Sequence, residues 1–264
     1  MHPLINIAVR AARSASQVIV RAMHRLESLE ITNKSHNDFV TEVDYQAEQA
    51  IIDVIRKAYP DHGILAEEGG NREGDEYQWI IDPLDGTTNY LHGFPQFAVS
   101  IGIKHRDRLS HGVVYDPLRE ELFTASRGEG AQLNSKRIRV SKRPGLEGAL
   151  LGTGFPFRDQ KYLDAYLKTL ATLITQTAGI RRPGSAALDL AYVAAGRLDG
   201  FWEIGLKPWD VAAGAVIIQE AGGLVGDFSG DSNFLDNGNV VAGNPKLFKA
   251  ILQAIRPHLP DSLL

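Results

Sequence analysis

The sequence predicts a layered protein in which an α+β half is followed by an α/β half, and two observations lead to this prediction. In the first half, short apolar segments at residues 97–103, 110–115 and 120–125 are separated only by turn-forming residues, which is typical of an antiparallel sheet. In the second half, strand-like and helix-like segments alternate, which is typical of an α/β arrangement. A structure-breaking Arg-Pro-Gly run lies between the halves, so we expect domains over residues 1–143 and 144–264.

The composition limits the classes of function. The chain has 264 residues, 44% of them hydrophobic, which is enough for one large or two modest domains. Its 28 Lys and Arg against 32 Asp and Glu give a net charge of -4, which argues against direct nucleic-acid binding. The chain has no cysteine, so disulfides and cysteine nucleophiles are excluded. No apolar run approaches the ~18 residues of a membrane span, and we expect a cytoplasmic protein without membrane contact.

Two amphipathic helices are expected near the N-terminus. Residues 4–26 repeat apolar side chains at three- and four-residue steps, with arginines away from that stripe. The segment has no acidic residue before Glu27, a feature that it shares with transit peptides. We interpret it instead as a packed helix with a solvated basic face. That basic face is also a surface for a partner. A polar loop is expected at residues 33–38, and a second helix at residues 44–58, with Asp44 in a position typical of an N-cap.

The second half is expected to hold four strands and four helices. Ser185 is expected to cap one helix, and Pro245 suits the first turn of the last one. The predicted strands cover residues 149–153, 200–203, 224–228 and 240–242, and the predicted helices cover residues 160–177, 186–195, 209–221 and the segment from Pro245 onward.

The run Trp-Ile-Ile-Asp-Pro-Leu-Asp-Gly-Thr-Thr-Asn at residues 79–89 carries the strongest chemical signal. Its apolar start predicts a strand that brings the Asp82 carboxylate to its end, and Pro83 is expected to turn the chain because it cannot extend the ladder. Asp85 follows three residues later, and two facing carboxylates repel unless a cation such as Mg²⁺ or Mn²⁺ lies between them. For this motif taken alone, an ordinary Asx-rich turn is the alternative.

Acidic residues at the ends of two other elements favour a shared cation site. Glu67 and Glu68 end another short predicted strand, and Asp210 lies at the start of an apolar helix. Gly86 permits close approach of the backbone to a ligand, and Thr87 adds a hydroxyl and an N–H group. The sequence therefore predicts a metal site beside an anion-binding turn.

These motifs, in this order and at these separations, resemble the inositol monophosphatase family and most closely its bacterial SuhB-type members. The resemblance rests on residues 82–89 together with Glu67-Glu68 upstream and Trp209-Asp210 downstream, and it extends from the N-terminal helix to at least Pro245. It implies the layered αβαβα sugar-phosphatase fold, with an active site that the second domain completes.

The resemblance also implies an activity and its cofactor. It implies a Mg²⁺-dependent phosphomonoesterase that hydrolyses inositol-1-phosphate to inositol and phosphate, through direct attack of a metal-activated water and without a phosphoenzyme. Two or three Mg²⁺ ions, for which Mn²⁺ can substitute, and inhibition by lithium are implied as well. The implied metal ligands are Glu67, Asp82, the Leu84 carbonyl, Asp85 and Asp210, with Asp82 bridging two ions. The implied catalytic residues are Asp44 and Thr87, which activate the water, and Glu68, which positions a bound water.

The implied substrate contacts are more widely spread. Backbone N–H groups of Gly86 and Thr87 suit the phosphate, whereas Arg181 fits equally well as part of an ordinary exposed arginine pair. Lys34 resembles a lysine on a mobile loop of the family, and an exposed loop lysine explains it equally well. The full set is Glu67, Leu84, Asp85, Gly86, Thr87, Arg181, Gly184, Ser185, Ala186, Glu203 and Asp210.

Two alternatives concern substrate and partners. Relatives of this fold cleave fructose bisphosphate, histidinol phosphate or nucleoside 3′-phosphates, so a broad sugar-phosphate or fructose-bisphosphate phosphatase is the alternative, although Glu203 favours substrates like inositol-1-phosphate. SuhB-type members are associated with Nus-factor complexes in ribosomal RNA transcription, which implies a Nus factor or RNA polymerase as partner in antitermination. A homodimer is also implied. The sequence does not fix the physiological substrate, the oligomeric state or the number of metals.

Overall fold

The structure, a computed structural model, describes residues 2–28, 31–35, 38–156 and 160–264. Side chains are described for residues 2–26, 40–156 and 160–264. Lys34 lies in a described strand, but its side chain is outside the described side chains. The interpretation of that lysine therefore stays a prediction.

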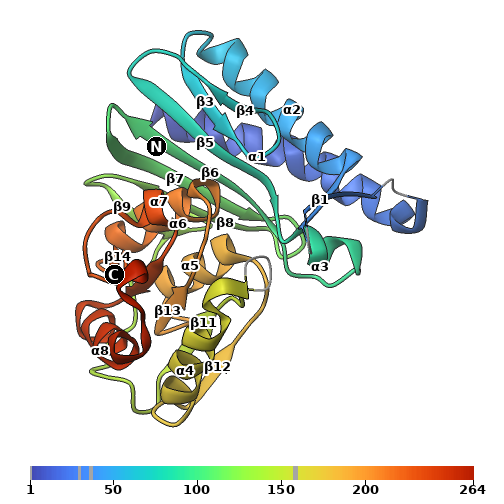
Figure 1. Cartoon of the computed structure of the whole chain (residues 1–264). Helices are drawn as coiled ribbons and strands as arrows, with labels where there is room; N and C mark the ends of the chain where they lie inside the picture. Colours follow the sequence, from blue (N-terminus) through green and yellow to red (C-terminus); the bar gives the residue numbers. More distant parts are fainter. Residues whose placement is uncertain (1, 29–30, 36–37, 157–159) are drawn as a thin grey trace.

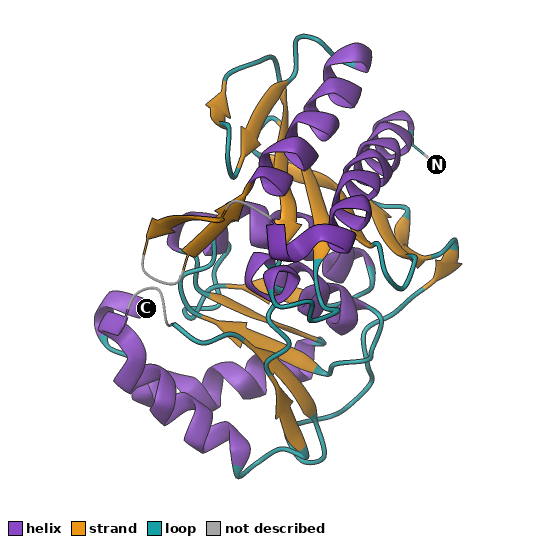
Figure 2. Cartoon of the chain, turned by 90° about the vertical axis from the view of Figure 1, so that its right-hand side faces the viewer, coloured by secondary structure: helices purple, strands orange, loops and turns teal. Residues whose placement is uncertain are grey.

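Helices and sheets alternate in five layers (Figure 1). One helix pair packs on the outer face of an eight-stranded sheet, a second pair lies between that sheet and a five-stranded sheet, and a third pair covers the outer face of the five-stranded sheet. Figure 2 shows the same arrangement from the side, with helices outside each sheet and between the two sheets. These pairs are α1 (Pro3–Ala22) with α2 (Glu42–Ala58), α5 (Ala186–Ala194) with α6 (Pro208–Glu220), and α4 (Leu163–Ile174) with α8 (Pro245–Ile255). The predicted αβαβα fold is confirmed.

The larger sheet has the order β10-β9-β8-β7-β6-β5-β3-β4 and is antiparallel except for the parallel pair β3 and β5. This arrangement follows from the short turns between β6 and β10, because only antiparallel neighbours can be joined so briefly. Its strands are β3 (Gly63–Ala66), β4 (Gly70–Arg72), β5 (Tyr77–Asp85), β6 (Ala98–His105), β7 (Arg108–Asp116), β8 (Glu121–Ser126), β9 (Gly130–Leu133) and β10 (Lys136–Arg137).

The smaller sheet has the order β12-β11-β13-β15-β14 and is mixed. Its strand β11 pairs in parallel with both neighbours, while β15 runs antiparallel to β13 and β14. Helices follow most of these strands, as the alternation in the sequence predicted. The strands are β11 (Leu150–Thr153), β12 (Gly179–Arg181), β13 (Gly200–Glu203), β14 (Leu224–Gly226) and β15 (Val240–Gly243).

The remaining described elements are short. A separate hairpin precedes α2, a single helical turn follows β5, and 3₁₀ turns lie after α1 and near the C-terminal end. These elements are β1 (Ile31–Ser35), β2 (Asp38–Thr41), α3 (Thr87–Leu91), α7 (Phe234–Asn237), η1 (Met23–Ser28), η2 (Gln160–Tyr162), η3 (Arg256–His258) and η4 (Asp261–Leu263).

Three predicted boundaries near the N-terminus were wrong. The first helix ends at Ala22 and continues only as a 3₁₀ segment, in which Arg25 has non-helical backbone angles. Residues 33–35 belong to β1 and Asp38 to β2, although polar composition favoured a loop over 33–38, of which residues 36 and 37 lie outside the described part. The second helix begins at Glu42 with Thr41 as its N-cap, because the Thr41 hydroxyl accepts a hydrogen bond from the Val43 N–H group.

Pro83 does not end its strand. β5 continues through Pro83 to Asp85, and the pairing with β6 shifts between Asp82 and Asp85, so that Pro83 and Leu84 together oppose one residue of β6. A bulge of this kind accommodates a residue that cannot donate to the ladder. The prediction of a turn at Pro83 was therefore wrong, and the two carboxylates lie on either side of a bulge.

The hydrophobic cores show how closely the two halves of the chain are packed. One core joins α1 and α2 to the larger sheet, a second joins α5 and α6 to both sheets, and a third lies between the smaller sheet and α4 and α8. The central core therefore draws side chains from both sides of residue 143. The division into domains 1–143 and 144–264 stays a prediction.

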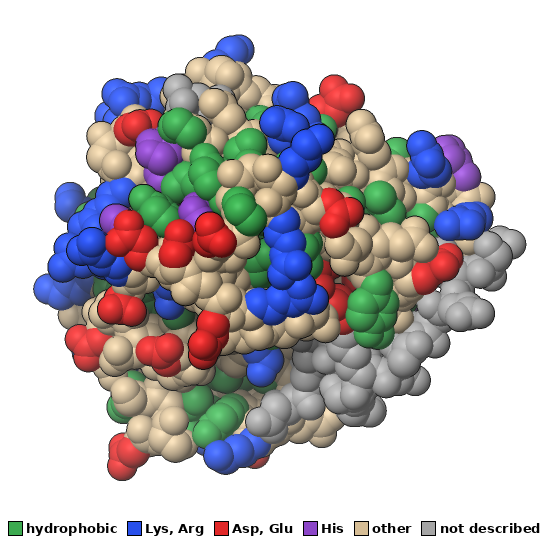
Figure 3. Space-filling view, turned by 90° about the horizontal axis from the view of Figure 1, so that it is seen from above, with side chains coloured by type: hydrophobic (Ala, Val, Ile, Leu, Met, Phe, Trp, Pro, Cys, Tyr) green, Lys and Arg blue, Asp and Glu red, His purple; other side chains and the backbone are tan. Residues whose placement is uncertain are grey.

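The outer face of α1 and α2 is charged. α1 buries its apolar stripe and leaves Arg10, Arg13 and Arg21 exposed, as expected of an amphipathic helix. Figure 3 views the molecule from above relative to Figure 1 and shows Lys and Arg side chains in several groups among acidic and apolar ones. Within the described part of the chain, no helix is long and apolar enough to cross a membrane.

His111 of β7 makes the fold sensitive to acid. Burial, together with the charges of His2 and His105, lowers the pKa of His111 to about 4, whereas a histidine in an unfolded chain titrates near about 6.5. Between these two pKa values the unfolded state binds more protons at His111 than the folded state does. The contribution of neutral His111 to the free energy of unfolding is therefore present above about pH 6.5 and is lost as the pH falls toward 4. We expect His111→Gln to reduce the loss of unfolding free energy between about pH 7 and about pH 5 in urea titrations.

An exposed histidine provides the control. His92 is exposed on the turn after α3, so His92→Gln should lose as much unfolding free energy as the wild type over the same pH interval. An unchanged loss in His111→Gln would contradict the assignment.

Candidate active site

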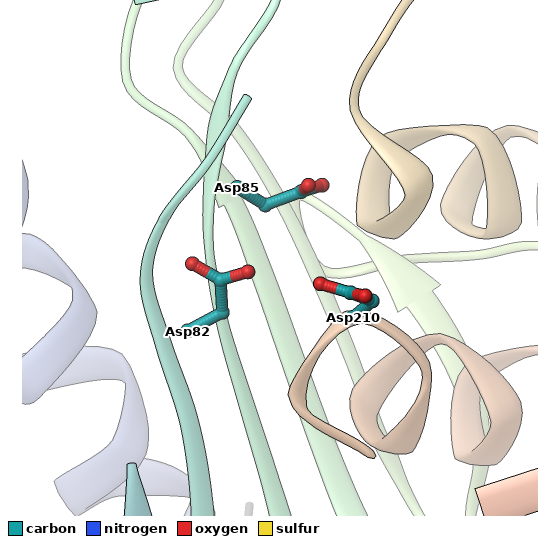
Figure 4. A group of neighbouring side chains, drawn as sticks. All are labelled: Asp82, Asp85 and Asp210. Atoms are coloured by element: carbon teal, nitrogen blue, oxygen red, sulfur yellow. The ribbon is translucent and has the colours of Figure 1, made fainter. Parts of the chain in front are cut away.

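Three aspartates converge where the larger sheet meets the middle helix layer. β5 supplies Asp82 and Asp85, and the first turn of α6 supplies Asp210, so that one carboxylate oxygen of each lies within 4.8 Å of the others (Figure 4). Asp82 is 1% exposed and Asp85 is 8% exposed. The described residues contain this one group of three or more potential metal ligands. The predicted convergence of residues far apart in the sequence is thus present in the structure.

The electrostatics of this group favour a bound cation. Burial raises the pKa of Asp82 well above its ordinary value, and the charges of Glu67, Asp85 and Asp210 act in the same direction. Burial also raises the pKa of Asp85 to about 6, against hydrogen bonds that favour its ionised form. Crowded buried carboxylates without a cation repel each other. An all-oxygen donor set of this kind fits a hard divalent cation such as Mg²⁺ or Mn²⁺.

Asp85 also fixes the start of α5. Its Oδ2 atom accepts hydrogen bonds from the Ser185 hydroxyl at 2.6 Å and from the Ala187 N–H group at 2.8 Å. Ser185 occupies the N-cap position, but its side chain makes no capping bond to the helix. The prediction that Ser185 caps α5 is corrected accordingly: the Asp85 carboxylate satisfies the free N–H group of the first turn, and the Ser185 hydroxyl supports that carboxylate.

The bulge after Asp82 shapes the next part of the site. The Leu84 N–H group donates to Asp82 Oδ1 at 2.9 Å, which closes the backbone over the carboxylate. Thr87 Oγ1 lies 3.1 Å from the Leu84 carbonyl oxygen and 3.1 Å from Asp44 Oδ1. A hydroxyl has one hydrogen, so Thr87 donates to only one of these acceptors at a time.

Asp44 is buried behind Thr87. Its Oδ2 atom accepts from the Thr41 N–H group at 2.9 Å and from the Thr41 hydroxyl at 2.7 Å, which makes the pair a capping box at the start of α2. The expected N-cap position of Asp44 was therefore wrong by three residues. Burial raises the pKa of Asp44, although the hydrogen bonds from Thr41 and Thr87 oppose this effect.

Gly86 is required by its backbone and by its surroundings. Its φ of +102° lies in the left-handed region, and a Cβ atom there would lie 2.9 Å from the Gln96 carbonyl oxygen and 3.3 Å from the Gly184 carbonyl oxygen. Asn89 ties the same turn to the second half of the chain, because its Nδ2 atom lies 2.8 Å from the carbonyl oxygens of Gln96 and Pro183.

A cavity of about 660 Å³ opens beside the three aspartates. It has the size of a small-molecule site. The sequence-predicted residues that line it are Glu67, Asp82, Leu84, Asp85, Gly86, Thr87, Gly184, Ser185, Ala186, Glu203 and Asp210. Asp44, Glu68 and Arg181 do not belong to the described lining. Asp44 nevertheless reaches the cavity through its hydrogen bond to Thr87.

The two predicted glutamates at the end of β3 occupy different places. Glu67 lines the cavity, and its charge acts on both Asp82 and Asp85. The Glu68 N–H group donates to Glu48 Oε2 at 2.8 Å, and Glu48 is buried on α2. The turn that carries Glu67 is therefore held by a carboxylate that the sequence did not single out.

Glu203 stands over a glycine. A Cβ atom on Gly154 would lie 1.9 Å from Glu203 Oε1 and 2.1 Å from its Cδ atom. Any side chain at residue 154 would therefore displace the Glu203 carboxylate from its present position on the cavity wall.

The arginine that faces the cavity is Arg182. Arg182 lines the cavity, and its guanidinium lies 5.4 Å from the centre of the Phe155 ring. Arg181 is exposed, and its Nη1 atom donates to the Ile180 carbonyl oxygen. The sequence marked the pair but could not decide which member would point inward.

An acidic residue of the cavity lining was missed. Asp189 of α5 is 1% exposed, and burial raises the pKa of its carboxyl well above the ordinary value, with the charges of Glu203 and Asp85 acting in the same direction. Its position between two leucines of an apolar helix was a signal that could have found it. Thr41 could have been found from its capping-box spacing to Asp44, whereas Glu48 and Gly154 left no distinctive pattern.

Comparison with known proteins agrees with this geometry. A family model described as the inositol monophosphatase family matches residues 1–259. The chain belongs to the inositol monophosphatase family. Its relatives in this family include the Pseudomonas aeruginosa protein named Nus factor SuhB, 60% identical over 100% of this chain and 99% of that protein. The Escherichia coli Nus factor SuhB is 54% identical with the same coverage of both chains.

Solved structures of the family have the same fold. The extragenic suppressor protein SuhB of Bartonella henselae has a TM-score of 0.95 at 42% identity, covering 98% of this chain and 100% of that one. Inositol monophosphatase from Anabaena has a TM-score of 0.85 at 37% identity, covering 99% of this chain and 98% of that one. The predicted family and its SuhB-type branch are confirmed.

The crowding of the aspartates leads to a prediction about stability. We expect Asp82→Asn to raise the melting temperature of the metal-free protein, because it removes a buried charge that Asp85 and Asp210 repel. In the wild type, Mg²⁺ at about 100 times its dissociation constant should add about 2.7 kcal/mol, or roughly 5–10 °C for a chain of this size. The variant should lose most of that increase.

Scanning calorimetry with and without Mg²⁺ measures both effects. Asp164→Asn, at an exposed aspartate of α4, serves as the control and should behave as the wild type does. A wild-type melting temperature that ignores Mg²⁺ would contradict a cation site at the three aspartates.

Proposed function

We propose that the chain is a divalent-metal-dependent phosphomonoesterase that hydrolyses inositol-1-phosphate or a closely similar polyol phosphate. Family membership supports a phosphatase. The observation that carries the proposal is the convergence of three aspartates on one wall of the cavity, beside a threonine hydroxyl that contacts a buried carboxylate. We propose a cytoplasmic location, in keeping with relatives that are named Nus factors.

The acidic residues would hold two or three Mg²⁺ ions, or Mn²⁺ in their place. We assign this role to Asp82, Asp85 and Asp210, with Glu67 and the Leu84 carbonyl as further ligands on the same wall. When bound, the ions supply positive charge for the phosphoryl oxygens and increase the acidity of an attacking water. Glu68 would position a bound water from the adjacent turn. The hydrogen bonds from Ser185 and Ala187 keep Asp85 oriented toward this site.

Thr87 and Asp44 would move the proton. If the Leu84 carbonyl oxygen held a metal ion, it would not accept the Thr87 hydrogen, and Thr87 would donate to Asp44 Oδ1. Thr87 Oγ1 would then be left to accept a hydrogen bond from the attacking water. The water proton then passes to Thr87 Oγ1 as the Thr87 proton passes to Asp44. Burial, which raises the pKa of Asp44, makes that carboxylate a better proton acceptor. The Thr41 capping bonds hold Asp44 in line for this transfer.

The rest of the cavity suits a polyol phosphate. Backbone N–H groups of Gly86 and Thr87 are proposed to bind phosphate oxygens, and the Glu203 carboxylate over Gly154 is proposed to accept hydrogen bonds from ring hydroxyls. The backbone at residues 184–186 completes this wall. We assign the arginine contact to Arg182, since it lines the cavity and Arg181 does not.

The alternative within the same chemistry is a broad sugar-phosphate or fructose-bisphosphate phosphatase. A cavity of about 660 Å³ admits larger esters than inositol-1-phosphate. Comparison of kcat/KM across inositol, sugar and nucleotide phosphates with Mg²⁺ separates the two possibilities. The proposal requires kcat/KM to be highest for the inositol phosphates.

A second role is proposed from the relatives. The Pseudomonas aeruginosa and Escherichia coli relatives are named Nus factors, so we propose that this chain also associates with Nus factors or RNA polymerase during antitermination, and that it forms a homodimer. Affinity capture with wild type and with Asp82→Asn tests whether that association depends on the active site. Light scattering determines the oligomeric state.

The Thr87–Asp44 pair yields a kinetic prediction. Thr87→Ala should lower kcat by about 10²–10⁴-fold, the usual contribution of a general base, with little change in Mg²⁺ affinity by calorimetry. Thr87→Ser keeps the hydroxyl and should retain most activity. Because paired residues that act as one unit are not additive, Thr87→Ala combined with Asp44→Asn should be little slower than either single variant.

Thr41→Ala is the control for the structural role of Asp44 in the capping box of α2. It removes the Thr41 hydroxyl cap at a cost of about 1 kcal/mol of stability. The Thr41 N–H group still donates to Asp44 Oδ2 and keeps Asp44 in place, so the variant should affect melting temperature more than kcat. Multiplicative losses in the double variant would show that Thr87 and Asp44 act independently and that the relay is wrong.

The cofactor assignment predicts the response to ions. Hydrolysis should stop after exhaustive chelation and return with Mg²⁺ or Mn²⁺, because carboxylates alone cannot stabilise the charge of a transferring phosphoryl group. Lithium in the millimolar range should inhibit. Full activity in the chelated protein, measured by phosphate release, would rule out the metal mechanism.

A further inference from the structure

Asp189 is a buried carboxyl group without a hydrogen-bond partner for one of its oxygens. It lies one turn into α5, where its N–H group donates to the Ser185 carbonyl oxygen at 3.0 Å. The residue is 1% exposed, and no described group bonds to its Oδ1 atom. The residue also lines the cavity beside the three aspartates. A polar group in this state lowers stability unless something outside the chain satisfies it.

The position of Asp189 relates it to Glu203. Gly152 lies on β11, and Gly154 directly follows the end of that strand at Thr153. A Cβ atom on Gly152 would lie 3.7 Å from the Asp189 Cβ atom, and one on Gly154 would lie 1.9 Å from Glu203 Oε1. Asp189 and Glu203 therefore approach backbone positions only two residues apart, and both line the cavity, where the charge of Glu203 acts on Asp189.

A bound cation is a poor candidate for the missing partner of the Asp189 carboxyl group. The group of potential metal ligands found among the described residues contains Asp82, Asp85 and Asp210 but not Asp189. A hydroxyl group suits it better, because a hydroxyl can donate to a carboxylate or accept from a carboxylic acid. The contact is then available in either protonation state of Asp189.

We propose that Asp189 is a specificity-determining residue that hydrogen-bonds a hydroxyl of the alcohol part of the substrate, next to the hydroxyl that Glu203 contacts. This inference rests on the proposed phosphatase function and extends it. It assigns the substrate class as phosphate esters of polyols with neighbouring free hydroxyls. Esters without such hydroxyls would leave Asp189 unsatisfied, and sites built to bond a hydroxyl discriminate strongly against analogues that lack it.

The test compares two esters that share the phosphate but differ in the alcohol. Inositol-1-phosphate offers ring hydroxyls, and phenyl phosphate offers none. We expect Asp189→Ala to lower kcat/KM for inositol-1-phosphate by about 10–100-fold, the loss typical of a hydrogen bond to a charged group, while kcat/KM for phenyl phosphate changes by less than about threefold. Asp189→Asn keeps a hydrogen-bonding group and should fall between Asp189→Ala and the wild type.

Stability provides an independent readout. Removing a buried carboxyl that lacks a partner should leave the melting temperature unchanged or raise it, whereas a structural role for Asp189 would lower it. Asp164→Ala, at an exposed acid of α4, should change neither the selectivity nor the melting temperature. An unchanged ratio of the two kcat/KM values, or an equal loss for both esters with a lower melting temperature, would overturn the proposal.

Failure of the phosphatase function is distinguishable from failure of this inference. If the wild type hydrolyses neither ester, the proposed function is wrong, and titration calorimetry with inositol-1-phosphate then decides the role of Asp189. Binding that is about tenfold weaker in Asp189→Ala than in the wild type would uphold the inference. Equal binding by the two proteins, or no binding by the wild type, would overturn it.

Discussion

The repulsion among Asp82, Asp85 and Asp210 is the constraint on which the rest of the site depends. The fold brings three carboxylates from a strand and a helix within 4.8 Å of one another, and two of them are buried. Such an arrangement is unfavourable for the empty protein, since both burial and like charge penalise the ionised forms. The sequence retains it at the wall of a large cavity, where a divalent cation would convert the same three groups into ligands.

The surrounding structure keeps these carboxylates in place. The bulge at Pro83 and Leu84 sets Asp82 and Asp85 on one side of β5, and the hydrogen bonds from Ser185 and Ala187 tie Asp85 to α5. Asn89 adds bonds from the turn after β5 to the Pro183 carbonyl. The site is therefore assembled between the larger sheet and the middle helices, and neither half of the chain contains it alone.

The hydrogen bonds also show why some residues serve two purposes. Asp85 is a ligand candidate and the helix cap of α5, and Asp44 belongs to the capping box of α2 while it accepts a bond from Thr87. Thr41 donates to one oxygen of Asp44 while Thr87 donates to the other, and donors from α5 hold Oδ2 of Asp85. Preorganisation of this kind positions reacting groups without movement during the reaction.

Much of the fold was predictable because local patterns agreed with it. The turns between residues 97 and 126 required antiparallel neighbours, and the acidic element ends around Asp82, Glu67 and Asp210 indicated one shared site. Details that depend on tertiary contacts were not predictable. Pro83 inside β5 needed the bulge, and the hydroxyl of Ser185 was directed to Asp85 by packing between distant segments.

The choice between two neighbouring residues was likewise decided by tertiary structure. Arg182 lines the cavity and Arg181 does not, and nothing in the sequence distinguishes them. The need for glycine at residue 154 follows only from the position of the Glu203 side chain, which a Cβ atom there would meet. Asp189 is different, since an acid inside an apolar helix is visible in the sequence and marks a buried polar group that needs a partner.

The most direct test of the central claim is anomalous diffraction from crystals grown with Mn²⁺, recorded near the manganese absorption edge. The account predicts an anomalous peak within coordination distance, about 2.0–2.3 Å, of carboxylate oxygens from Asp82, Asp85 and Asp210. Peaks confined to other parts of the surface, or three aspartates that remain in contact without a peak between them, would contradict it.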